Sequence, residues 1–249
     1  MSAPVFLHDD LAAALDGARL PAQVTLTGPE GRHAATVRRL TASEPVELVD
    51  GRGLRASGVV VSAADDRLVV SVRVAGSELP PLLRLVLVQA LAKGERGEYA
   101  VELATEVGVD EVVPWSAHRC IVRWDGARGE RALRRWRATA REAGKQSRRA
   151  RHPVVSEPVT TDGLLARAAQ ARALVLHEGA AEPLATTPLP AAGELLLVVG
   201  PEGGLTDPEL AALTGAGASA VRLGPSVLRT SSAGAVAAAV VSARTARWA

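Results

Sequence analysis

Hydrophobic residues follow two different patterns along this chain of 249 residues. Between residues 24 and 74 they alternate with polar residues over short stretches, which end at turn residues such as Asp50-Gly51 and Asp65-Asp66. Beyond Pro81, short runs of branched aliphatic residues take turns with longer segments that have apolar residues at helical spacing. The first pattern predicts a small antiparallel β-barrel. The second predicts strands and helices that alternate around a mostly parallel sheet.

The individual elements can be assigned from these patterns. In the first part the expected strands are 46–49, 54–61 and 68–74. In the second part the expected strands are 82–89, 109–114, 174–177, 195–199 and 220–223, and the expected helices are 98–107, 129–146, 161–171, 207–214 and 232–248. Glycine, serine and two prolines interrupt the chain between the two parts. We therefore expect a barrel domain over 1–75, a linker over 76–81 and an α/β domain over 82–249.

Composition narrows the class of protein. Hydrophobic residues make up 47% of the chain, which is enough for a sizeable core. Cys120 is the single cysteine, so an intrachain disulfide and a two-cysteine metal or redox motif are excluded. The five histidines are scattered without metal-ligand spacing, and we expect no metal. Neither a signal peptide nor an apolar run of membrane-spanning length is evident, so we expect a cytoplasmic protein that does not bind membranes.

Positive charge gathers in one segment, although the formal net charge is only +2. Residues 119–151 contain eleven arginines and one lysine, against Asp125, Glu130 and Glu142. A basic segment on a nearly neutral protein is typical of a site for a polyanion such as nucleic acid. A solvated helix face is the commoner explanation for an isolated run of charge, and it stays open at this point.

Several familiar nucleotide and hydrolase motifs are excluded. Residues 215–220 match the G-x-G-x-x-A form of a dinucleotide fingerprint, but they precede an expected strand, whereas the fingerprint follows one. Residues 200–204 lack the Gly-Lys-Ser/Thr that a P-loop requires, so an NTPase is not expected. The chain contains no G-x-S-x-G nucleophile elbow.

Three polar or glycine-rich segments follow expected strands of the second part. They are 177–179 (His-Glu-Gly), 200–204 (Gly-Pro-Glu-Gly-Gly) and 223–230 (Leu-Gly-Pro-Ser-Val-Leu-Arg-Thr). Each segment alone is compatible with a tight turn. Because the carboxyl ends of parallel strands meet at one edge of a sheet, we expect the three to surround one site. Glycines let the backbone approach a ligand closely, so a small polar molecule held by N–H and C=O groups is the expected occupant.

A larger set of motifs resembles one known family. The motifs are 33, 37–40, 50–51, 90–96, 102–109, 142–149, 200–204 and 223–233. In this order, and over almost the whole chain, they resemble the SPOUT (trefoil-knotted) RNA methyltransferases, specifically the family that methylates N3 of a uridine in small-subunit 16S rRNA. The chain departs from the family pattern at Leu103, where lysine is usual, at Arg148, where glycine is usual, and at Ser231-Ser232, where Glu-Thr is usual.

The resemblance implies a C-terminal α/β domain with a trefoil knot, preceded by a PUA-like barrel that helps to hold RNA. It also implies S-adenosylmethionine as cofactor, 16S rRNA of the small ribosomal subunit as substrate, and a homodimer. The candidate cofactor-binding residues are His177, Glu178, Gly200, Glu202, Gly203, Leu223, Gly224, Leu228, Thr230 and Ala233. The candidate RNA-binding residues are Arg39, Arg119, Arg123, Gln146, Arg149 and Arg151.

Arg149, Arg229 and Glu202 are the candidate catalytic residues. Uridine N3 carries a proton that must leave, and a guanidinium stabilises the negative charge that develops at O2 or O4. Glu202 is a candidate to orient the base or the cofactor's amino group, with a cap of the next helix as its structural alternative. A non-catalytic RNA-binding or assembly factor with this fold, or a methyltransferase that acts on another RNA, are the alternative functions.

Overall fold

The computed structural model describes residues 3–248, and the chain divides into two compact units. The first unit contains the chain up to Pro80 together with Gly144–His152. The second unit contains Pro81–Ala143 and the chain from Pro153 onward. The first unit is therefore assembled from two separate stretches of sequence.

In the described part of the first unit, five strands form one sheet in the order β1-β3-β4-β5-β2. The strands are β1 (Val5–Leu7), β2 (Ala22–Leu26), β3 (Pro45–Val49), β4 (Leu54–Ala64) and β5 (Arg67–Ser77). The short helices are α1 (Leu11–Leu15) and α2 (Gly28–Arg32), and α2 continues into a π-helical turn, η1 (His33–Val37). Buried Phe6, Leu48, Leu68 and Val70 belong to the core of this unit.

The expected turns and the antiparallel strands of this unit are present, with one correction. Asp65 and Asp66 adopt positive φ angles of 50° and 55° between β4 and β5, as a tight hairpin turn requires. However, β1 pairs with β3 in parallel, so the expectation of a purely antiparallel arrangement is wrong at this edge. The reason is connectivity: the chain between β1 and β3 runs through β2 and the helices, and a crossover of this kind allows parallel pairing.

The segment 144–152 is bound to the first unit by backbone and side-chain contacts. Gly53 N donates to Ala150 O at 2.9 Å, and His152 N donates to Gly51 O at 2.9 Å. Lys145 Nζ lies 2.6 Å from Glu30 Oε1, and both side chains are largely buried. This segment therefore completes the packing of a unit whose other strands lie far earlier in the sequence.

In the described part of the second unit, six parallel strands form a sheet in the order β11-β9-β10-β6-β7-β8. The strands are β6 (Leu83–Ala90), β7 (Glu111–Trp115), β8 (Val154–Val155), β9 (Arg172–Leu176), β10 (Gly193–Val199) and β11 (Ser219–Val221). The helices are α3 (Arg96–Glu106), α4 (Gly126–Gln146), α5 (Thr161–Ala168), α6 (Asp207–Gly215) and α7 (Thr230–Ala243). The expected mostly parallel α/β sheet is confirmed. The two-residue strand β8 is too short to leave a pattern in the sequence.

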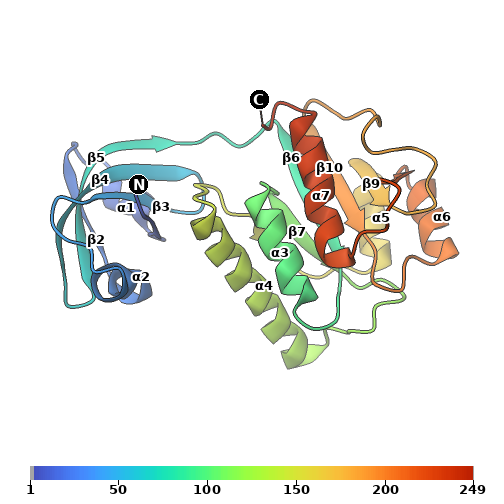
Figure 1. Ribbon diagram of the computed structural model, residues 1–249, viewed down its shortest axis with the longest axis horizontal. Coiled ribbons are helices and arrows are strands. Elements are labelled where there is room, and N and C mark those ends of the chain that lie inside the picture. The colour runs from blue at the N-terminus through green and yellow to red at the C-terminus, as the bar shows by residue number, and fades with distance from the viewer. Residues whose placement is uncertain (1–2, 249) are drawn as a thin grey trace. The chain divides into compact units, whose positions relative to one another are not determined.

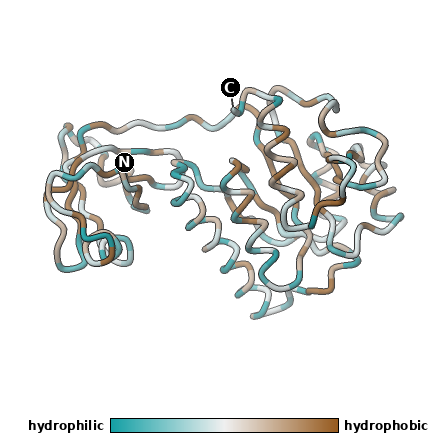
Figure 2. The backbone as a smooth tube through the Cα atoms, in the orientation of Figure 1, coloured by the Kyte–Doolittle hydropathy of each residue, from teal (hydrophilic) through white to brown (hydrophobic). Residues whose placement is uncertain are grey.

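Helices α3 and α7 lie side by side on one face of this sheet, and α7 packs over β6 and β10 (Figure 1). Hydrophobic residues follow the central strands and α7 (Figure 2), because β6 and β10 are covered on both faces. Gly234 lies where α7 meets β6, and a Cβ atom there would come within 2.6 Å of Leu87 Cδ1. The close approach of α7 to the sheet therefore depends on glycine. The trefoil knot stays a prediction.

Candidate active site

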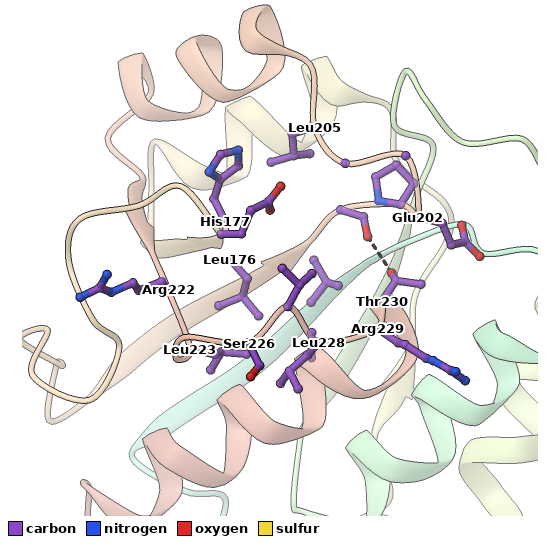
Figure 3. A pocket seen from close by; sticks show the side chains of 18 of the residues that line it. Leu176, His177, Glu202, Leu205, Arg222, Leu223, Ser226, Leu228, Arg229 and Thr230 are labelled. Carbon is purple, nitrogen blue, oxygen red and sulfur yellow. Dashed lines mark hydrogen bonds between the residues drawn. The ribbon is translucent and has the colours of Figure 1, made fainter.

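A cavity of about 570 Å³ lies at the carboxyl ends of β9, β10 and β11 (Figure 3). Its lining comes from the three segments that follow these strands, with additional contributions from α3 and α7. The lining residues are Arg96, 176–178, 199–205, 222–224, 226–230 and Ala233. All ten candidate cofactor-binding residues belong to this lining. The structure thus brings together the segments that follow three strands, between Leu176 and Ala233, with Arg96 from much earlier in the sequence.

The glycines of the segment 200–204 differ in what a side chain would meet there. Gly204 has a φ of +72°, which side chains rarely tolerate. A Cβ atom at Gly200 would lie 3.2 Å from the Leu205 side chain, and one at Gly203 would lie 3.4 Å from Arg119 Cβ. Gly204 therefore depends on glycine for its backbone conformation, and a side chain at Gly200 would crowd Leu205.

Glu209, and not Glu202, caps the helix that follows the loop. Thr206 Oγ1 accepts from Glu209 N, and the Glu209 carboxylate accepts from Thr206 N, so that the two form a capping box at the start of α6. Glu209 Oε1 also accepts from His118 N at 2.7 Å. Burial alone would raise the pKa of Glu209, but these backbone hydrogen bonds lower it below its ordinary value. The structural alternative considered for Glu202 is therefore wrong.

Glu202 turns instead toward the segment that precedes α3. Its Oε1 accepts from Lys93 N at 3.2 Å and from Arg96 Nη1 at 3.1 Å. Burial acts to raise the pKa of Glu202, but the backbone hydrogen bonds and Arg96 lower it. A carboxylate with a lowered pKa is a weak base. The geometry thus favours a role in holding the loop over a role in proton removal.

Two of the candidate RNA-binding arginines bind backbone carbonyl groups, and those bound by Arg119 belong to the cavity wall. Arg119 Nη1 donates to Gly203 O at 3.0 Å and to Leu205 O at 3.1 Å, across the glycine-rich loop. Arg123 Nη1 donates to Ala117 O at 3.1 Å, within the same segment as Arg119. Both residues are exposed. Their contact with RNA stays a prediction.

Arg229 has a different environment from the other candidate arginines. It is exposed, and among the described residues its side chain makes no hydrogen bond or ion pair. Figure 3 shows the side chain leading away from the glycine-rich loop and toward α3. Arg229 also occupies the N-cap position of α7 with an extended backbone, so its direction is set by the start of that helix. A guanidinium at the rim of the cavity is available to a ligand or substrate.

The remaining candidates belong to the first unit and do not line the cavity. Arg149 N donates to Gly144 O, and Arg151 Nη2 donates to Glu78 O at 2.6 Å. Gln146 is the last residue of α4, and Arg39 is exposed with a φ of +53° after η1. The structure therefore assembles Arg229 and Glu202 around one cavity, whereas Arg149 lies in the other unit.

A second cavity, of about 770 Å³, adjoins the first and shares Arg96 and Arg229 with it. Its other lining residues are Lys93, Gly94, Glu95, Tyr99, Ser231 and Ser232. Tyr99 is half exposed, and so presents an aromatic ring beside a cluster of cations. Within residues 3–248, no group of side chains has the arrangement of a metal site. No helix among these residues is long and apolar enough to cross a membrane.

Sequence reasoning missed two residues of this region, Arg96 and Gln89. Arg96 lies in a segment that matched the family pattern, but its pairing with Glu202 joins residues 106 positions apart. Gln89 left a clearer signal, since it is a polar residue in the otherwise apolar run that forms the end of β6. Its side chain is fully buried and donates to Thr230 Oγ1.

Comparison with known proteins identifies the family. Residues 78–242 match the model of an RNA methyltransferase domain, and residues 26–73 match that of an RNA methyltransferase PUA domain. The chain is 50% identical to ribosomal RNA small subunit methyltransferase E of Mycobacterium bovis, over 91% of this chain and 88% of the relative. The chain belongs to this methyltransferase family. The Bacillus subtilis member is 29% identical over 89% of this chain and 90% of the relative.

Solved structures of family members agree with this assignment. The methyltransferase E of Neisseria gonorrhoeae, bound to S-adenosyl methionine, has a TM-score of 0.85 at 26% identity and covers 98% of both chains. A methyltransferase from Legionella pneumophila in complex with the same cofactor has a TM-score of 0.84 at 25% identity, over 98% of this chain and 99% of the other. The inferred family, the class of enzyme and the PUA-like N-terminal part are confirmed.

Proposed function

We propose that this methyltransferase transfers the methyl group of S-adenosylmethionine to N3 of a uridine in 16S rRNA. The observation that carries the proposal is the cavity at the carboxyl ends of three parallel strands, in a family whose solved members bind this cofactor. The assembled small ribosomal subunit as substrate, a homodimer as the active form and a cytoplasmic location complete the proposal.

The residues of the cavity fit a nucleoside with a charged tail. Its volume falls within the roughly 300 to 1,000 Å³ that is usual for such ligands. Leu176, Leu205, Leu223 and Leu228 supply apolar surface for a purine ring (Figure 3). Backbone groups of 200–204 supply donors and acceptors without intruding side chains. When bound, S-adenosylmethionine supplies a methyl group on a positively charged sulfonium sulfur, and the rest of the molecule leaves as a neutral thioether.

Arg229 and Glu202, at the rim of the cavity, have different proposed roles in the reaction. The exposed guanidinium of Arg229 is suited to stabilise the negative charge that develops on the uridine carbonyl oxygens as N3 loses its proton. Glu202 has a lowered pKa and is already bonded to Lys93 N and Arg96, so it positions the loop and does not receive that proton. Arg149, which belongs to the first unit, stays a candidate catalytic residue.

The second cavity is our proposed entrance for the target uridine. It meets the first cavity at Arg229 and presents the half-exposed ring of Tyr99 together with Lys93. An unstacked RNA base is held by aromatic stacking, and its phosphate by cations. Exposed arginines such as Arg39 would add phosphate contacts that position the RNA without reading its sequence, so binding should weaken steeply with salt.

Transfer of labelled methyl groups tests the proposal directly. The protein is incubated with labelled S-adenosylmethionine and either small subunits that lack the modification or naked 16S rRNA, and the modified nucleoside is identified by mass spectrometry. We expect 3-methyluridine at one site, with subunits as the better substrate. Intact cofactor binding without transfer to either RNA would favour the non-catalytic RNA-binding factor. Transfer to a different RNA would favour the other alternative.

Arg229→Ala tests the proposed charge stabilisation. Because the Arg229 side chain has no partner among the described residues, its loss should leave the melting temperature nearly unchanged, while kcat falls by about 100-fold or more. Arg134→Ala is the matched control, since Arg134 is also exposed and, among the described residues, its side chain pairs only with Glu130, at 3.6 Å. A large fall in melting temperature for Arg229→Ala, with the control unaffected, would mean that Arg229 is structural.

A further inference from the structure

Gln89 is a fully buried polar residue at the end of β6, next to the apolar residues Val88 and Ala90. Its Nε2 donates to Thr230 Oγ1 at 3.1 Å and to Ala90 O at 3.2 Å. Thr230 Oγ1 in turn donates to Gly200 O at 2.6 Å, and this bond is drawn in Figure 3. Three elements, β6, α7 and the end of β10, are thus joined by one chain of hydrogen bonds.

The direction of this chain is fixed by the chemistry of its members. A carbonyl oxygen only accepts, so the single hydroxyl proton of Thr230 must point to Gly200 O. The hydroxyl oxygen of Thr230 is then left as an acceptor, and the amide nitrogen of Gln89 supplies the donor. An apolar residue at position 89 would remove this donor, and the Thr230 hydroxyl would then be held only by its own bond to Gly200 O.

Thr230 and Gly200, the two residues that Gln89 reaches through these hydrogen bonds, line the cavity, but Gln89 itself does not. Gly200 is the first residue of the glycine-rich loop, and Thr230 is the first residue of α7. Arg229, the N-cap of α7, directly precedes Thr230. Holding Thr230 against Gly200 therefore sets the distance between two walls of the cavity and the point from which the Arg229 side chain extends.

The amide of Gln89 is retained at a cost in stability. Its Oε1 is buried and has no hydrogen-bond partner among the described residues. A buried polar atom without a partner destabilises the folded state, whereas methionine would fill a similar volume without that penalty. Local rules of packing are broken most often where a site requires it. Ser242 shares the unsatisfied atom, but only the Gln89 side chain combines it with a hydrogen bond to a residue of the cavity wall, Thr230, and that combination points to a role for Gln89 in the site.

We propose that Gln89 is a positioning residue for methyl transfer, which acts through Thr230 to fix the Gly200 carbonyl and the start of α7. The inference rests on the proposed function, because the wall that it sets is that of the cofactor cavity. Gln89 contacts neither cofactor nor substrate. Its loss should weaken cofactor binding without weakening the fold.

Gln89→Met removes the amide and preserves the length of the side chain. We expect an unchanged or slightly higher melting temperature, because removal of the unsatisfied Oε1 offsets the two hydrogen bonds that Nε2 no longer donates. The KM and calorimetric Kd for S-adenosylmethionine should rise by about tenfold, as the loss of one aligned contact gives. The KM for RNA should change less than twofold. Ser242→Ala is the matched control: Ser242 Oγ is likewise buried without a partner among the described residues, but Ser242 lies near the far end of α7. This control should also raise stability, and should leave both constants unchanged.

A double-mutant cycle with Thr230 tests whether the two residues act as one unit. Thr230→Val should weaken cofactor binding more than Thr230→Ser does, and Gln89→Met combined with Thr230→Val should be no worse than Thr230→Val alone. Unchanged cofactor constants for Gln89→Met, or additive losses in the cycle, would overturn the inference while the wild-type protein remained active. Wild-type protein that bound no S-adenosylmethionine would overturn the proposed function, and the inference with it.

Discussion

Arg148 adopts a backbone conformation that usually belongs to glycine. Its φ is +58°, and its N–H donates to Lys145 O at 3.0 Å, so it ends α4 in the left-handed region. The family pattern has glycine at this position, and the structure gives the reason for that preference. The backbone oxygen of Arg148 accepts from Arg55 Nη2 at 2.8 Å, a contact that any residue at position 148 can make.

Substitution of Arg148 should reveal this strain. Arg148→Gly removes the Cβ atom, which lies too close to a backbone carbonyl oxygen in the left-handed conformation, but it also increases the freedom of the unfolded chain. The free energy of unfolding should therefore change by less than about 1 kcal/mol. Arg148→Val keeps a Cβ and adds a branch, and should destabilise the protein by about 1 to 2 kcal/mol. Urea denaturation of both variants measures the difference. Equal stability of the two would mean that the left-handed conformation is not maintained in solution.

Contacts between two side chains, or between a side chain and a backbone group, are predictable from the sequence only where the two residues lie close together in it. The cap at Thr206 follows from its spacing to Glu209, three positions away. The contacts of Arg119 with Gly203 and of Glu202 with Arg96 join residues 84 and 106 positions apart. Nothing in the spacing of such residues indicates that they meet, because their approach depends on the order of the strands.

Helix α7 illustrates how closely one element is fitted to its neighbours. A Cβ atom at Gly234 would lie 2.6 Å and 3.0 Å from the two Cδ atoms of Leu87, which is fully buried in β6 and cannot yield. Gly234→Ala should therefore destabilise the protein by about 1 to 3 kcal/mol, even though alanine favours a helix. Gly215 in α6 has open space where its Cβ would lie, so Gly215→Ala should be neutral or stabilising. Thermal denaturation of both variants checks the contrast, and a stabilised Gly234→Ala would contradict it.

At the level of elements, the apolar runs predicted the central strands because parallel strands in an α/β sheet are buried on both faces. The runs predicted β6 and β10 to within a few residues. Two features lacked such a signal. The two residues of β8 carry no period, and the parallel pairing of β1 with β3 depends on the path of the chain between them.

Across the second unit, a cluster of charges lies at the opposite edge of the sheet from the cavity. Arg84, Glu111 and Glu194 stand at the starts of β6, β7 and β10, and Arg167 of α5 pairs with both glutamates, at 2.7 and 2.8 Å. The Glu111 side chain is only 6% exposed and also accepts from Ser156 Oγ. Burial alone would raise the pKa of Glu111, but hydrogen bonds from Arg167 and Ser156 lower it below its ordinary value.

This cluster should make stability depend on acid pH. A carboxyl whose pKa is lowered by folding stabilises the protein fully when the pH is above the pKa of the unfolded state, near 4.5. This stabilisation is lost as the pH falls through the lower pKa of the folded state. Glu111→Gln should lower the free energy of unfolding by about 2 to 3 kcal/mol at pH 7. The difference from wild type should shrink below pH 4.5 in urea titrations at several pH values. Glu130→Gln, in an exposed pair, should leave the urea midpoint unchanged. A pH-independent difference for Glu111→Gln would contradict the assignment.

At the scale of the whole molecule, the sequence pattern did not indicate that a later segment returns to the first unit. A boundary near Pro80 follows from composition, but the return of Gly144–His152 to the first unit does not. That return is specified by tertiary contacts, such as Lys145 with Glu30. The hydrophobic pattern of the segment itself is that of a helix end and a loop.

The return of this segment has a consequence for synthesis on the ribosome. Residues up to Pro80 emerge first, yet Ala150, which packs with Leu7 and Val49, and Lys145, the partner of the largely buried Glu30, are not yet made. The N-terminal unit must therefore wait, incompletely packed, until more than sixty further residues have been translated. Those residues include β6, α3 and β7, so the PUA-like unit completes its packing only after two of the six strands of the parallel sheet have been made.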